Sequence, residues 1–535
     1  MKYDAGTFHY SSRRELVYGK KGMISTTHPL ASQAGLEVLK KGGNAIDAIV
    51  AAAAALTVVE PSANGIGGDS FAIIWYKGEM YGLNSSGAAP ELMKREAFQQ
   101  KGTEIPRYGL EPVTVPGVPK GWASLVNRFG RLALSEVIEP AAVIAEEGHP
   151  VTSKIAEAWE RTYHIFSKQL KDYPVLQMWF DTFCPDGKPL QAGDMWFSKG
   201  HAKTLREIGA TDAEAFYTGW IADEIDAFSK KYDGYIRKKD LEQHQVEWIT
   251  PLSTAYKGYD IWEMPPNGQG IVVLMALNIL EELTLKDKES PDTYHKQIEA
   301  IKLAFSDGLQ YISDPRSMKA KIEDMLSKEY AANRAGLITE QALSPEPGKF
   351  DNPGTVYLAA ADGEGNMVSY IQSNYAGFGS GSVVPGLGIS LHNRGNQFSL
   401  DENHPNILVP GKRPFHTIIP GFITQNGKPI GPFGVMGGGM QPQAHLQVLS
   451  SMIDFQLNPQ DALDAPRWQW LEGKKVLVEP QFPYPITQDL IKRGHEVQIA
   501  ASPLSFGRGQ IILQQENGVL VGGTEPRADG HIAVW

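Results

Sequence analysis

The 535-residue sequence has a single cysteine, no long uninterrupted apolar run and no basic cluster beyond a few short ones. One cysteine, Cys184, cannot form an internal disulfide, and its isolation is typical of a reducing compartment. The longest apolar stretch, residues 45–59, is interrupted by Asp47 and is short for a membrane span, so it predicts a buried helix. The first 23 residues lack the apolar core of a secretory signal. We therefore expect a cytoplasmic protein with no membrane partner.

The charge balance and the standard site motifs exclude several function classes. The formal net charge is −11, and a nucleic-acid partner would require a basic face that the sequence does not offer. The sequence has no P-loop, no GxSxG, no HExxH and no Cys/His zinc pattern. Neither a metal ion nor an organic cofactor is implied, so any chemistry has to come from side chains and backbone groups.

Helical and strand patterns alternate without the regular period of a parallel sheet, which predicts an α+β fold. Apolar spacing predicts two helices within residues 29–59, separated at Gly42–Gly43 and with Asn44 capping the second. Most of residues 121–343 is expected to be helical, and a helix is expected over 442–455. Short apolar and β-branched runs predict strands at 70–76, 80–83, 417–424 and 510–514.

A turn-rich, polar segment over residues 344–354 is followed directly by an apolar run that begins with Thr355. Residues 355–361 and 367–373 predict a hairpin whose first residue carries a hydroxyl. If the bond between Gly354 and Thr355 is cut, Thr355 gains an α-amino group with a pKa of about 7.7–8.0. That amine can act as the base that activates the hydroxyl on the same residue. The alternative is that Thr355 simply begins a strand.

A second feature is the glycine run near residue 437. Acyl transfer passes through a tetrahedral oxyanion, which is stabilised by backbone N–H groups. Gly437 and Gly438 can bring such groups close to a ligand because they have no side chains. The alternative is a packing turn before the next helix. Neither feature is specific alone, and their order along the chain carries the prediction.

Together these segments resemble the γ-glutamyltranspeptidase family, in the family order and over nearly the whole chain. The matching segments are Asn44–Ala48, Gly65–Gly68, Thr355 with Asp362 and Gly365–Asn366, Phe378–Gly381, Phe398–Ser399, Lys412–Pro414, Gly437–Gly438 and Ala465–Arg467.

The resemblance implies a four-layer αββα N-terminal-nucleophile hydrolase sandwich. It implies self-cleavage between Gly354 and Thr355 into a large chain, 1–354, and a small chain, 355–535, that stay intertwined in one fold. By the same resemblance Thr355 is the nucleophile, and Ser373 contacts its amine. Gly437 and Gly438 form the oxyanion hole. The implied partner is a small amide substrate, and a homodimer is compatible with the resemblance.

The expected substrate pocket departs from the family pattern. The family's carboxylate-binding Arg falls in the stretch Ser86–Pro90, which contains no Arg, and its acidic ammonium ligand is replaced by Gln397. Losing these charge-assisted contacts makes the substrate harder to assign than the reaction. Arg394 is a hypothetical replacement anchor for a carboxylate. The substrate-binding candidates are Tyr375, Arg394, Gln397, His416 and Thr417.

Three functions remain open from the sequence. The first is a γ-glutamyltransferase or glutathione hydrolase that forms an acyl-enzyme on Thr355. The second is a cephalosporin acylase of the glutaryl type, which the loss of an acidic ammonium ligand at Gln397 favours. The third is an unprocessed, non-catalytic homologue that acts as a binding protein. Transfer and hydrolysis are not distinguished by the sequence.

Overall fold

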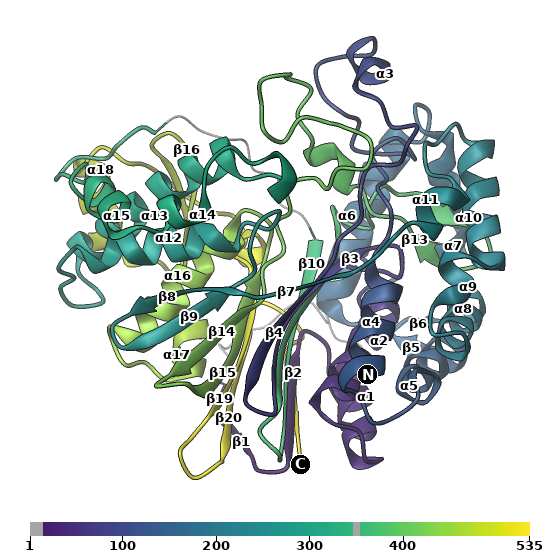
Figure 1. Cartoon of the computed structure of the whole chain (residues 1–535), viewed down its shortest axis with the longest axis horizontal. Coiled ribbons are helices and arrows are strands. Elements are labelled where there is room, and N and C mark those ends of the chain that lie inside the picture. The colour runs from purple at the N-terminus through teal and green to yellow at the C-terminus, as the bar shows by residue number, and fades with distance from the viewer. Residues whose placement is uncertain (1–13, 346–353) are drawn as a thin grey trace.

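The computed structural model describes residues 14–345 and 354–535, and two seven-stranded sheets lie at its centre with helices on both sides (Figure 1). The first sheet has the order β21 (His531–Val534), β2 (Gly22–Thr26), β10 (Gly354–Asp362), β11 (Met367–Tyr375), β3 (Asp69–Tyr76), β4 (Glu79–Ser85), β7 (Glu247–Ile249). The second has the order β1 (Val17–Gly19), β20 (Leu520–Thr524), β19 (Arg508–Gln514), β15 (Lys428–Met436), β14 (Gly421–Gln425), β9 (Tyr259–Glu263), β8 (Leu252–Tyr256).

The helices fall into two groups, one beside each sheet (Figure 1). Beside the first sheet are α1 (Pro29–Lys40), α2 (Ala45–Val59), α4 (Val118–Phe129), α5 (Leu134–Glu147), α6 (Ser153–Gln169), α7 (Gln177–Phe183), α8 (Lys199–Ala210) and α10 (Trp220–Lys231). Beside the second are α12 (Gly270–Glu281), α13 (Pro291–Tyr311), α15 (Lys328–Ala335), α16 (Met440–Ile453), α17 (Pro459–Asp464) and α18 (Tyr484–Lys492). The fold is therefore mixed helix and sheet, as predicted.

A buried apolar layer joins strands of the two sheets. It includes Phe71 on β3, Tyr357 on β10, Phe422 on β14 and Ile512 on β19, each fully buried. Alternating side chains of a strand point to opposite faces, so neighbours of these residues pack instead against the helices. The strands β10 and β11 are consequently buried on both faces, and the residues they present to the site are shielded from water.

Helix α2 illustrates how the sequence determines its own packing. The Asn44 side chain accepts hydrogen bonds from Ile46 N–H and Asp47 N–H, and Asp47 accepts one from Asn44 N–H, which makes a capping box. Every residue of α2 is buried. Its alanine-rich face lets it approach the sheet closely, and Asp362 of β10 accepts a hydrogen bond from Ala45 N–H at 3.1 Å.

Most of the predicted elements are confirmed, and two are corrected. The strand expected over 417–424 begins only at Gly421. Pro420 has no N–H for a sheet ladder, while Ile419 N–H and the Thr417 carbonyl bond to glutamine side chains. The middle of the chain also contains the β8–β9 hairpin, which the helical interpretation of residues 121–343 missed. Among the described residues, no helix combines the length and apolar character needed to cross a membrane.

Candidate active site

Thr355 lies near the start of β10 and is fully buried. The pairing of β10 with β11 is regular from Val356 onward, but its register shifts between Gly354 and Val356. Thr355 is therefore at a bulge, which re-aims a side chain relative to a regular strand. Its Oγ1 lies 2.9 Å from Ser373 Oγ. Gly354, the residue before the predicted cleavage site, pairs with Tyr375, and residues 346–353 lie outside the described part of the chain.

Arg394 is fully buried and points toward this hydroxyl pair. Its Nη2 donates to Ser373 Oγ at 3.3 Å, and its Nη1 donates to Thr417 Oγ1 at 2.8 Å. Its Nε has no hydrogen-bond partner within the described part of the chain. Burial lowers the pKa of Arg394 to about 10, although the nearby Asp69 acts in the opposite direction. A buried guanidinium with an unused N–H is chemically suited to a carboxylate.

Tyr375 and Gln397 pack over the same guanidinium. The Tyr375 ring centroid lies 4.5 Å from the Arg394 guanidinium carbon, and Gln397 Nε2 donates a short hydrogen bond to the Tyr375 hydroxyl. Tyr375 has a φ of +70°, which is uncommon for a bulky residue. The Tyr375 ring thus packs on the Arg394 guanidinium, at the side of the site where the sequence predicts substrate recognition.

Asp69 and two histidines lie behind Arg394. Asp69 begins β3 and is the cross-strand partner of Ser373. His416 Nε2 is 3.0 Å from Asp69 Oδ2, and His392 Nδ1 is 3.6 Å from the same oxygen. Burial raises the pKa of Asp69 to about 7, and burial lowers the pKa of both histidines. We call Asp69, His392, Arg394 and His416 the site cluster.

The glycine turn approaches the same place from the second sheet. Gly437 and Gly438 follow β15 with φ values of +139° and +56°, a region that favours glycine. Their carbonyls accept hydrogen bonds from the start of α16, and neither N–H has an acceptor within residues 14–345 and 354–535. Gln269 Nε2 donates to both the Thr417 and the Gly438 carbonyls, so a chain of side-chain hydrogen bonds leads from Thr355 through Arg394 to this turn.

The structure therefore brings the predicted site residues together in one connected set of contacts. His416 uses both ring nitrogens, one toward Asp69 and one accepting from Ile418 N–H, so it has none left for a ligand. Sequence analysis missed Asp69 and Gln269. An acidic residue placed between a glycine turn and a buried strand was the available signal for Asp69, whereas Gln269 had none.

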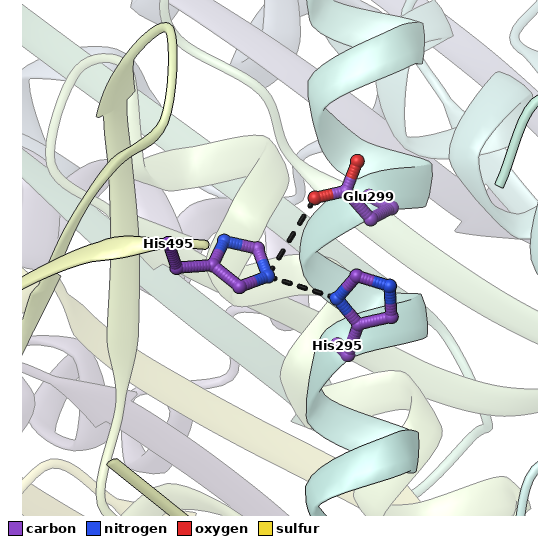
Figure 2. Close-up of side chains that lie close together, drawn as sticks. All are labelled: His295, Glu299 and His495. Atoms are coloured by element: carbon purple, nitrogen blue, oxygen red, sulfur yellow. Dashed lines mark hydrogen bonds and ion pairs between the residues drawn. The ribbon is translucent and has the colours of Figure 1, made fainter. Parts of the chain in front are cut away.

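A second buried group of titratable residues is the one set, among the described residues, whose donor atoms are close enough to hold a metal ion (Figure 2). His295 and Glu299 lie one turn apart on α13, and His495 lies just before β18 (Glu496–Ile499). His495 Nε2 is 2.8 Å from His295 Nδ1 and 3.6 Å from Glu299 Oε1. We call these three residues and Lys302 the anchor cluster.

Lys302 already supplies a positive charge to this cluster. Its Nζ donates to Glu299 Oε1 at 2.7 Å and to His495 Nδ1 at 3.4 Å. His295 Nε2 in turn donates to the Thr339 carbonyl at 2.8 Å, and Leu343 N–H donates to Glu299 Oε2 at 3.1 Å. Every ring nitrogen is engaged, so the anchor cluster holds residues 339–343 in place without needing an ion.

Comparisons with known proteins find similarity over almost the whole chain. The family model for γ-glutamyltranspeptidase matches residues 31–535. A glutathione hydrolase-like proenzyme of Bacillus subtilis, YwrD, is 37% identical over 96% of this chain and 98% of its own length. An oxamate amidohydrolase proenzyme of Klebsiella pneumoniae is 33% identical over 96% and 98%. The crystal structure of a cephalosporin acylase from Bacillus halodurans is 55% identical, covers 100% of this chain and 99% of its own, and has a TM-score of 0.96.

Proposed function

Because the chain belongs to the γ-glutamyltranspeptidase family, we propose that it is a self-processing amidohydrolase that uses Thr355 as its nucleophile. One observation carries the proposal. The Thr355 hydroxyl is buried at a strand bulge, 2.9 Å from Ser373 Oγ, on the residue that follows the predicted cleavage site. A threonine that merely began a strand would have no need of a hydroxyl partner, a buried Arg and a glycine turn around it.

In the processing step, Thr355 Oγ1 attacks the carbonyl carbon of Gly354. The C–N bond between the two residues breaks, the hydroxyl proton passes to the departing nitrogen, and an ester joins Gly354 to Thr355. Water then hydrolyses the ester to give the Gly354 carboxylate and the restored Thr355 hydroxyl. Gly354 has no Cβ to obstruct the approach of the oxygen. The products are the chains 1–354 and 355–535.

In turnover, the freed α-amine of Thr355 takes the proton of the hydroxyl as Oγ1 attacks the substrate amide. The N–H groups of Gly437 and Gly438, which have no acceptor among the described residues, stabilise the oxyanion. The amine returns the proton to the leaving nitrogen, and the acyl-enzyme is released by water or by an acceptor amine. Ser373 Oγ, which accepts from Tyr375 N–H and Arg394, keeps Thr355 in position.

The proposed chain division is compatible with a single intertwined fold. Strand β10 of the small chain pairs with β2 of the large chain on one side and β11 on the other, and β11 pairs with β3. Cleavage before Thr355 therefore leaves both chains in the same sheet. We propose that the two sheets and their flanking helices form the four-layer αββα sandwich of N-terminal-nucleophile hydrolases.

For the acyl half of the substrate we propose a short group that ends in a carboxylate and carries no α-ammonium. Arg394 supports a carboxylate because its Nη2 contacts Ser373 Oγ and its Nε–H has no partner among the described residues. The neutral Gln397 offers no negative charge to an ammonium group. A glutaryl or shorter acid amide fits these features better than a γ-glutamyl amide, which remains the second candidate.

Two measurements test the proposal. On a denaturing gel a processed protein separates into chains of about 39 and 20 kDa, the 58.7 kDa mass divided in proportion to 354 and 181 residues. A single band at full mass supports the binding-protein alternative instead. Among the enzyme functions, faster hydrolysis of glutaryl-4-nitroanilide than of γ-glutamyl-4-nitroanilide supports the acylase. The reverse order contradicts the proposed acyl group and leaves the nucleophile unaffected.

A further inference from the structure

Asp69, fully buried at the start of β3, connects two of the segments that hold Arg394. It is the cross-strand partner of Ser373, whose Oγ accepts a hydrogen bond from Arg394 Nη2. Asp69 Oδ2 also lies 3.0 Å from His416 Nε2. The residue after His416, Thr417, accepts a hydrogen bond from Arg394 Nη1. The Asp69 carboxyl group therefore helps to fix the position of the Arg394 guanidinium.

The hydrogen bonds around Asp69 indicate a proton on its carboxyl group. His416 Nδ1 accepts from Ile418 N–H, so His416 Nε2 carries the ring proton and donates to Asp69 Oδ2. His392 Nε2 donates to the Thr114 carbonyl at 2.9 Å, so Nδ1 of the neutral ring carries only a lone pair. That lone pair faces Asp69 Oδ2 at 3.6 Å. Two buried electron-rich atoms repel each other unless a proton lies between them, so this geometry favours a neutral Asp69.

The charged groups around Asp69 agree with a carboxyl group that changes its charge near neutral pH. Burial raises the pKa of Asp69 to about 7, and the cations Arg394 and Arg413 oppose this shift. Arg413 is itself ion-paired with Glu247. Tyr217 interacts electrostatically with Asp69, but burial raises the pKa of Tyr217, so it stays uncharged. Burial lowers the pKa of both histidines of the site cluster, which leaves Asp69 as the member of that cluster whose charge changes between pH 6 and 8.

We propose that Asp69 is a positioning and specificity-determining residue, and that the site binds a substrate carboxylate tightly only while the Asp69 carboxyl group holds a proton. The inference rests on the proposed function, because it takes Arg394 as the anchor for the acyl carboxylate. When Asp69 is ionised, its charge offsets that of Arg394, and a further buried carboxylate is left without compensation. When Asp69 is neutral, the Arg394 charge is free to attract an anion. A carboxylate bound at Arg394 therefore favours the protonated form of Asp69.

The test compares two substrates that differ in one charge on the acyl group, glutaryl-4-nitroanilide and the 4-nitroanilide of glutaric acid monomethyl ester. The quantity measured is the ratio of kcat/KM for the carboxylate to that for the ester, between pH 6 and 8. The substrate carboxylate is ionised throughout this range. The ratio is independent of the amount of folded, processed enzyme. It also cancels the need of both substrates for an unprotonated Thr355 amine.

In the parent we expect the ratio to fall by about tenfold from pH 6 to 8, as Asp69 loses its proton. Asp69→Asn should hold the ratio constant, so that at pH 8 it exceeds the ratio of the parent. Asp69→Ser is a second uncharged variant, used if Asp69→Asn gives too little enzyme. A purely structural role would lower both rates together and leave the ratio unchanged. Asp47→Asn is the matched control, because Asp47 is a buried carboxylate in the capping box of α2, and it should keep the pH dependence of the parent.

The outcomes separate this inference from the proposed function. A parent ratio that changes by less than about twofold between pH 6 and 8 overturns the assignment of Asp69 while hydrolysis itself stands. A fall that both uncharged variants retain also overturns it, because the fall then comes from another group, such as the Thr355 amine. A processed enzyme that cleaves neither nitroanilide contradicts the proposed acyl group, and the assignment of Asp69 fails with it.

Discussion

The site cluster and the anchor cluster contain the same kinds of group, yet they differ in how completely those groups are used. Each places a buried cation, a carboxylate and two histidines together. In the anchor cluster Lys302 and both histidines have partners on every polar atom that the structure describes. In the site cluster Arg394 Nε is a buried donor with no hydrogen-bond partner among the described residues. A closed network serves to hold segments together, whereas unused buried donors are costly unless a ligand engages them.

The two clusters also differ in their proton linkage. Burial raises the pKa of Asp69 in the site cluster from 3.8 to about 7, so the folded state binds a proton there that the unfolded state releases. Burial lowers the pKa of His495 in the anchor cluster from 6.5 to about 2, so the folded state lacks a proton that the unfolded state binds. The two clusters therefore make contributions of opposite sign to the pH dependence of stability, although they contain similar residues.

The largest expected effect on stability comes from breaking the anchor cluster. Lys302→Met leaves Glu299 buried without its cation, which typically costs about 3–5 kcal/mol in the free energy of unfolding. We expect a correspondingly lower midpoint in a denaturant titration, with activity per folded molecule close to that of the parent. A decrease of less than about 1 kcal/mol in the free energy of unfolding would contradict the conclusion that Glu299 depends on Lys302 in a closed hydrogen-bond network.

The double variant Lys302→Met with Glu299→Gln sharpens that result. Removing both charges removes the unpaired carboxylate, and a Gln side chain still offers an oxygen to Leu343 N–H. We expect the double variant to recover at least half of the stability that the single variant loses. A double variant that is less stable than Lys302→Met would show that the ion pair is not what the single substitution disturbs.

Removing the cation of the site cluster should affect substrate recognition more than folding. Arg394→Ala removes the proposed carboxylate anchor, and a hydrogen bond to a charged group contributes about 1.5–3 kcal/mol. We expect KM for glutaryl-4-nitroanilide to rise by about 10–100-fold. The folding cost is smaller than for Lys302→Met because Asp69 can become neutral. An unchanged KM would remove Arg394 from substrate binding.

The smallest effect at any one pH is the change in pH dependence, in which the two clusters should separate by sign. As pH falls below 6.5 the unfolded state protonates His495 and the folded state does not, which removes up to about 1.4 kcal/mol of stability per pH unit. His495→Gln should therefore reduce the decrease in the free energy of unfolding between pH 6.5 and 4. Asp69 stabilises the folded state at low pH and loses that contribution as pH rises from 3.8 through 7. Asp69→Asn should therefore make the loss of stability on acidification steeper than in the parent.

Denaturant titrations at several pH values give the slope of the free energy of unfolding against pH for each variant and for the parent. The difference between parent and variant matters, because other buried histidines contribute to the slope of each protein equally. If the two substitutions change the slope in the same direction, the assignment of opposite proton linkages is wrong.

Local features of the site could be predicted from the sequence, whereas contacts between residues far apart in the sequence could not. The hairpin that places Thr355 opposite Ser373 follows from two apolar runs and a short turn, and Asn44 predicts the start of α2. In contrast, Asp69 meets Ser373 only because two strands about 300 residues apart in sequence become neighbours. Nothing in a local pattern records that pairing.

The anchor cluster shows the same limit. His295 and Glu299 lie one turn apart on a helix, a spacing that places them on one face. Their partner His495 follows 200 residues later, in a turn with no signal of its own. The departure from the family pattern at Gln397 is visible in the sequence. That the Tyr375 ring packs on the Arg394 guanidinium required the structure.

The most direct test of the account is the intact mass of the purified protein together with the N-terminal sequence of its smaller chain. We predict a chain of about 20 kDa that begins Thr-Val-Tyr-Leu, and a Thr355→Ala variant that stays at the full 58.7 kDa and cleaves no amide. A smaller chain that begins elsewhere, or a Thr355→Ala variant that matures and turns over substrate like the parent, would contradict the central role of Thr355.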